Sequence, residues 1–128
     1  MELKEDQTFQ ILVPMKVSGN TVRSILWGAF NQGSTYWLND IIGADNNDKP
    51  YTEQIIDGET LTIIAPTSED DSNEEHSLTL VTLLDGLKQY VEEYGDCIVK
   101  GEVDSCLIDS VDCDIILQYA LFGEQIFA

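Results

Sequence analysis

The chain has 128 residues and a formal net charge of −18, because 24 aspartate and glutamate residues outnumber six lysine and arginine residues. This length and a hydrophobic fraction of 43% predict one domain over residues 1–128, whose core needs no metal or disulfide. The charge argues against direct binding to nucleic acid, which needs a basic surface, and against binding to anionic membranes.

The start of the chain, residues 1–10, lacks the basic and apolar regions of a signal peptide. No run of about 18 apolar residues occurs, so we expect no transmembrane helix. A cytoplasmic location follows by default.

Residues 8–17 alternate apolar with mostly polar side chains, which predicts a strand with one buried face. Phe9, Ile11 and Val13 belong to that face. Pro14 cannot donate to a strand ladder, so we expect an edge strand.

The segment 18–33 has apolar side chains at helical spacing and predicts a helix over about residues 20–32. Ser18 or Asn20 can cap its start, and Gly33 suits a left-handed residue after its end. The following residues, 34–42, are rich in aromatic and β-branched side chains and predict a second strand.

The middle of the chain predicts a hairpin with an acidic loop. Residues 51–58 favour one or two helical turns, and 59–66 and 77–81 favour strands. The polar segment between these strands includes residues 68–77, which hold five acidic residues and His76, the single histidine of the chain. The acidic run is then most simply the solvated tip of the hairpin.

Residues 82–95 form the clearest predicted helix, with Thr82 and Asp85 resembling a capping box and Gly95 ending it. A mixed connection follows, with a short strand expected at 97–99.

The last predicted helix, 110–123, is apolar nearly all round, so we expect it to be buried in the core or in a partner. Asp109 or Ser110 can cap its start, and Gly123 ends it. The predicted fold class is α+β, with a mostly antiparallel sheet of three to five strands packed against about three helices. We place these helices at about 20–32, 82–94 and 110–122.

The sequence offers little for catalysis. Nucleophilic catalysis by serine or cysteine usually needs a histidine, and His76 lies in the acidic run. No acidic residue lies within an apolar stripe, where burial could raise its pKa. Phosphate-binding glycine motifs are absent, and the chain has one arginine. We therefore predict a non-enzymatic protein with no catalytic residues and no cofactor.

A metal site is not expected either. Cys97, Cys106, Cys113 and His76 are the only soft ligands, and no C-x-x-C motif occurs. Buried free thiols explain the three cysteines better. The acidic runs lack the glycine and the residue order of a calcium-binding loop.

Two stretches carry a resemblance. They are "VSGNTVRSILWGAFNQGSTYW" at 17–37 and "DSVDCDIILQYALFGEQIF" at 109–127. Both resemble a group of small acidic proteins encoded in phages and integrated mobile elements of Firmicutes and related gut bacteria. That group has a Gly-Gly pair before its Tyr-Trp pair, whereas Gln32 precedes Gly33 here. The resemblance implies an accessory gene on a mobile element and lends no catalytic residue.

One hypothesis is that the protein inhibits a host defence protein by mimicking nucleic acid. Its carboxylates would occupy a basic surface of a nuclease or another nucleic-acid-binding protein, in the manner of an anti-CRISPR or anti-restriction inhibitor. The candidate partner-binding residues are Glu69, Asp70, Asp71, Glu74, Glu75, Glu92, Glu93, Asp96, Glu102, Asp104, Asp109, Asp112 and Asp114.

The alternative is a small structural or regulatory module whose acidity serves only solubility, because charge runs are usually solvated faces. A homodimer formed through Trp27, Trp37 or the last helix is compatible with both hypotheses.

Overall fold

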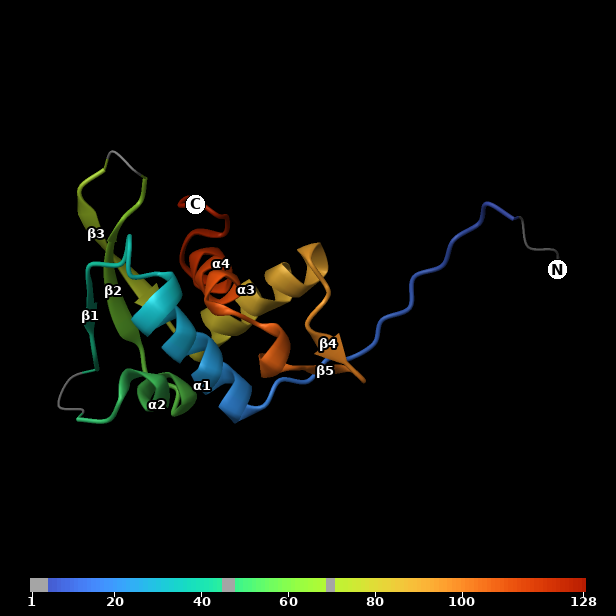
Figure 1. Cartoon of the computed structure of the whole chain (residues 1–128), viewed down its shortest axis with the longest axis horizontal. Helices are drawn as coiled ribbons and strands as arrows, with labels where there is room; N and C mark the ends of the chain where they lie inside the picture. The colour runs from blue at the N-terminus through green and yellow to red at the C-terminus, as the bar shows by residue number, and fades with distance from the viewer. Residues whose placement is uncertain (1–4, 45–47, 69–70) are drawn as a thin grey trace.

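The computed structural model describes residues 5–44, 48–68 and 71–128. It confirms the α+β class: an antiparallel sheet in the order β1-β2-β3 lies beside the helices, and a two-stranded sheet, β4-β5, lies at the other end of the folded body (Figure 1). In chain order the α-helices and strands are α1 (Gly19–Gly28), β1 (Asp40–Ile42), α2 (Tyr51–Ile56), β2 (Leu61–Pro66), β3 (Asn73–Leu78), α3 (Leu80–Glu93), β4 (Ile98–Val99), β5 (Glu102–Val103) and α4 (Ser110–Phe122). A π-helical turn, Ala29–Gly33, continues α1, and a 3₁₀ turn, Ser105–Leu107, precedes α4.

The core lies between the sheet and the helices. Leu61, Ile63 and Ala65 alternate along β2 and are fully buried, as the predicted strand requires. They share one hydrophobic cluster with buried side chains of α1, α3 and α4, among them Ile25, Leu83 and Ile116. Burying such a side chain stabilises the fold by about 1.5–3 kcal/mol. The core therefore depends on β2 and on helices from both ends of the chain.

Helix α4 is buried nearly all round, as its sequence predicts. Asp109 and Asp112 form a reciprocal capping box at its start, and Gly123 adopts a left-handed conformation (φ 75°) at its end. Helix α3 packs closely on α4 at Gly86, where a Cβ atom would lie 2.6 Å from the backbone nitrogen of Ala120. The absence of a side chain at Gly86 thus permits this close approach.

The strand predicted over 8–17 is wrong. Residues 7–15 form an extended arm that leaves the body near β5 (Figure 1). Only Lys16 pairs with a strand: its N–H donates to Gly101 and its carbonyl accepts from Val103, both at 2.9 Å. The alternating apolar side chains are present, but no neighbouring strand or core covers most of them.

The strand predicted over 34–42 is restricted to β1. Residues 34–37 form a turn instead, because Ser34, Tyr36 and Trp37 direct their side chains to Asp114. Gly33 does not have the left-handed conformation that the sequence predicts. Its role is close packing, since a Cβ atom there would lie 2.0 Å from the carbonyl oxygen of Ser110.

The hairpin strand β3 lies earlier than the predicted 77–81. Thr79 ends the strand and caps α3, so this helix begins at Leu80 and not at the predicted Thr82. His76 therefore lies on β3 and not in a solvated loop. Its ring packs edge-on against that of Phe122, with the two ring centroids 5.0 Å apart. Its Nε2 lies 3.1 Å from the carbonyl oxygen of Ala65. These contacts give His76 a structural role.

Candidate partner-binding surface

Eight of the eleven described carboxylates predicted to bind a partner fall into two regions at opposite ends of the body (Figure 1). The first, here called the hairpin carboxylates, comprises Asp71, Glu74 and Glu75. The second, here called the acidic end, comprises Glu92, Glu93, Asp96, Asp109 and Asp112. Glu69 and Asp70 lie outside the described residues.

The acidic end forms where two helices meet. Helices α3 and α4 pack against each other, with Tyr90 near the start of α4 and Gln89 and Glu93 bonded to Gly123 and Tyr119 near its end. Tyr90 of α3 lies close enough to Asp112 of α4 for this carboxylate to raise the pKa of its hydroxyl. Burial raises the pKa of Tyr90 most, and the charges of Asp112 and Asp96 raise it further. Two carboxylates that are 16 positions apart in sequence, Asp96 and Asp112, thus act on the same hydroxyl.

Two carboxylates of the acidic end stand where the helix disfavours them. Glu92 and Glu93 are exposed in the last turn of α3, beside its negative end, and no basic residue lies in that turn. Lys88 is 4.0 Å from Glu92, a surface pair worth at most a few tenths of a kcal/mol. Glu93 accepts a hydrogen bond of 2.5 Å from Tyr119. The macrodipole therefore gives no reason for acidic residues at this position.

The hairpin carboxylates do not form one face. Glu74 and Glu75 are consecutive residues of β3, so their side chains point to opposite faces of the sheet. Asp71 accepts a hydrogen bond of 2.6 Å from Thr67. Hydrogen bonds from Thr67 and Ser68 lower the pKa of Asp71. The structure therefore spreads these charges around the hairpin.

Three further predicted residues are counted in neither region, although the backbone N–H of Asp104 bonds the carbonyl of Cys97, next to Asp96. Glu102 is exposed on β5. Asp104 is half-buried and accepts from the backbone N–H of Cys106, which caps the short 3₁₀ turn Ser105–Leu107. Asp114 is 5% exposed, so it is removed from the candidate surface: its carboxylate is inside the protein.

The buried Asp114 also corrects the expectation that no acidic residue lies within an apolar stripe. Its Oδ1 accepts from Trp37 Nε1 at 2.6 Å and from the Ser34 hydroxyl at 2.8 Å, and its Oδ2 accepts from the Tyr36 hydroxyl at 2.8 Å. Gln118, one turn later on α4, donates at 3.2 Å. These four donors solvate the carboxylate in place of water. Asp114 and Gln118, with the side chains that bond them, form what is here called the polar centre of α4. Its signal in the sequence is the presence of these two polar residues, four positions apart, within the apolar run "DIILQYALF".

The three cysteines differ in exposure. Cys97 and Cys113 are buried thiols, as predicted, and burial raises the pKa of Cys113 to about 12. Cys106 is exposed, contrary to the prediction. Over residues 5–44, 48–68 and 71–128, no group of three or more His, Cys, Asp or Glu side chains is placed to hold a metal ion.

Raised tyrosine pKa values predict a loss of stability at alkaline pH. Burial, and second the hydrogen bond to Asp114, raise the pKa of Tyr36 to about 12, and burial also raises those of Tyr90 and Tyr119. Because the folded state holds these protons more tightly, its stability is complete below about pH 10 and falls as the pH rises through about 12. Urea titrations at several pH values across this range would measure the loss of stability, and tyrosinate absorbance would follow the ionisation of the tyrosines. Identical ionisation of native and urea-unfolded protein would contradict it.

Within the described residues no helix is long and apolar enough to cross a membrane. The fold and surface define a small acidic α+β protein with a concentrated acidic end. Comparisons of the chain with protein-family models, with curated proteins and with solved structures find no match.

Proposed function

We propose that this protein is a non-enzymatic inhibitor from a phage or mobile element, and that its acidic end binds a basic surface of a host nucleic-acid-binding protein. The supporting observation is that Asp96, just after α3, and Asp112, in the first turn of α4, both act on Tyr90, with Glu92, Glu93 and Asp109 at the same two helix termini. Such a cluster suits a channel that normally binds phosphates. The proposed site of action is the cytoplasm of the bacterial host.

Electrostatics gives the physical basis of the proposal. Duplex DNA carries one charge per about 1.7 Å of helix axis, and a protein that binds it is attracted mainly by these phosphates. Carboxylates on adjacent helical turns are about 5–6 Å apart, a spacing comparable to that of neighbouring phosphates. With a net charge of −18 the chain would approach a basic target rapidly and would not bind nucleic acid itself.

A pull-down from a bacterial lysate tests this function. The tagged protein is expected to retain a basic nuclease or another nucleic-acid-binding protein, and both rising salt and added duplex DNA are expected to release it. The purified target should then bind the protein and lose its own affinity for DNA. Retention that DNA does not compete, or a target that binds DNA equally well with the inhibitor present, would contradict the proposal.

One observation favours the alternative, a small accessory module whose acidity serves solubility. Asp104, Asp109 and Asp112 cap helices, and Asp71 is bonded within the hairpin loop. These carboxylates thus have structural uses that need no partner. If this alternative holds, the pull-down would retain no protein that added duplex DNA can release from it.

A further inference from the structure

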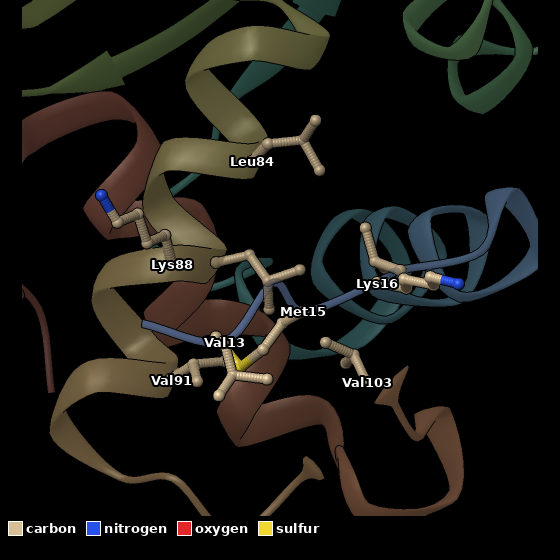
Figure 2. A pocket seen from close by; sticks show the side chains of 9 residues that line it. Val13, Met15, Lys16, Leu84, Lys88, Val91 and Val103 are labelled. Carbon is tan, nitrogen blue, oxygen red and sulfur yellow. The ribbon is translucent and has the colours of Figure 1, made fainter. Parts of the chain in front are cut away.

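The N-terminal arm, here residues 7–15, exposes more apolar surface than a solvated segment needs. Phe9, Ile11, Leu12 and Val13 are 67–85% exposed, and Met15 is 46% exposed. The base of the arm lines a groove of about 360 Å³ against α3 and β5. Figure 2 shows Val13 and Met15 beside Val91 of α3. An exposed apolar segment of this kind indicates a binding site for another molecule.

From Thr8 to Met15 the arm has one backbone edge that keeps every hydrogen-bond donor. Lys16 directs its N–H and carbonyl toward β5, and these groups alternate sides along an extended chain. The backbone N–H and carbonyl groups of the even-numbered residues, with the carbonyl of Pro14, therefore face the β5 side of the arm, here called the inner edge. Those of the odd-numbered residues face away from β5, along the outer edge. Among the residues that the structure describes, none hydrogen-bonds the backbone of Phe9, Ile11 or Val13. Pro14 thus removes a donor only from the inner edge and leaves the outer edge complete.

The distribution of charge along the chain indicates which molecule binds to this backbone edge. No acidic residue occurs from position 7 to position 39, and this stretch carries Lys16 and Arg23. The arm is therefore not the part of the chain that recognises a basic surface. It is the part that can approach a second copy of the same acidic chain with the least repulsion.

A second copy also complements the arm in charge. Two arms paired antiparallel through their outer edges can be centred on Ile11, so that residues whose numbers sum to 22 lie opposite each other. Phe9 then faces Val13. Asp6, which this structure places in a turn just before the arm, would face Lys16 at both ends of the ribbon if the chain there becomes extended on pairing. The Asp6–Lys16 and Thr8–Pro14 pairs occupy the non-hydrogen-bonded positions, where Pro14 needs no donor.

This register also keeps the bodies apart. The two Lys16 residues would be ten positions apart along the ribbon, or about 34 Å, which is close to the diameter of a domain of this size. Charges at this separation are largely screened at 0.15 M salt, where the Debye length is about 8 Å, and not at 0.01 M, where it is about 30 Å. Phe9 of each arm would lie at the groove of the other copy.

We infer that two copies of this chain associate through their N-terminal arms, which pair as an antiparallel ribbon. This interface is separate from the acidic end and does not depend on the proposed function. Sedimentation of the full-length protein should show a concentration-dependent dimer that rising salt strengthens, whereas salt weakens binding to a basic partner. A chain that stays monomeric up to near-millimolar concentration at moderate salt would overturn the inference.

Two proline variants form a matched pair. Ile11→Pro removes a donor from the outer edge at the centre of the ribbon, in both copies, and should raise the dimer dissociation constant about tenfold or more. Gln10→Pro removes a donor from the inner edge and should change it little. Since both positions lie in the exposed arm, circular dichroism and melting should be unchanged. Equal effects of the two variants would contradict the inferred edge.

A charge exchange tests the register. Asp6→Lys and Lys16→Asp each place like charges opposite one another in a homodimer, so each variant alone should dimerise more weakly by about threefold to tenfold. A mixture of the two restores opposite charges at both ends and should form heterodimers preferentially. Mixing without heterodimer preference would exclude pairing through this register.

Discussion

Replacing Asp114 with alanine is expected to lower the free energy of unfolding by about 3 kcal/mol or more, because it leaves several buried donors without an acceptor. Trp37 Nε1 and the Ser34 hydroxyl are the principal ones, both bonded to Oδ1. Domains of this size are stable by only about 5–15 kcal/mol, so the loss would be a large fraction of the total. Urea unfolding followed by tryptophan fluorescence would measure it.

Two variants serve as controls for this prediction. Asp85→Ala removes an exposed carboxylate from α3 and should change stability by less than about 0.5 kcal/mol. Asp114→Asn keeps the shape and one acceptor oxygen, so its effect should fall between the two. An Asp114→Ala protein with the same urea midpoint as the native chain would show that the buried carboxylate contributes no net stability.

Reversing three charges of the acidic end, with Glu92→Lys, Glu93→Lys and Asp96→Lys together, is expected to weaken binding of the proposed basic partner at least about a hundredfold. All three side chains are exposed, so the fold should persist, and the lysines would suit the negative end of α3. Titration of the purified partner by calorimetry, beside a melting curve, measures both effects.

The hairpin carboxylates provide a matched control for this experiment. Reversal of Asp71, Glu74 and Glu75 to lysine changes the net charge by the same amount at the opposite end of the body. Binding should be largely retained in that variant. Equal losses in both triple variants would indicate that only net charge matters, and an unchanged affinity in the first would remove the acidic end from the proposal.

Sequence periodicity predicted the helices and the strand that bury an apolar face whichever elements they pack against. Helix α4, the strand β2 and the two helices α1 and α3 follow from apolar spacing, because each buries one face or all faces in any compact arrangement. Local capping chemistry offered Asp109 or Ser110 as the cap of α4, and Asp109 is the cap. It misplaced the start of α3, where Thr79 has the same chemistry as Thr82.

The errors have a common physical cause, which is contact between distant residues. The arm has the alternation of a strand, yet a strand also needs a neighbour, and only Lys16 has one. The turn at 34–37 has strand-forming residues, yet three of them bond Asp114, about 80 positions away. For the candidate surface, composition identified the carboxylates, but only the packing of α3 on α4 separates the acidic end from the rest.

The polar centre of α4 also bears on how the chain is made. Asp114 holds the turn at 34–37, and Gln118 accepts from the backbone N–H groups of Ile126 and Phe127 near the end of the chain. Synthesis proceeds from the N-terminus, so the turn at 34–37 is made long before Asp114 and before the residues that Gln118 bonds. The core cannot close on the ribosome while α4 is missing. The long-range contacts of Asp114 and Gln118 must therefore form late, after residues 114–127 have been made.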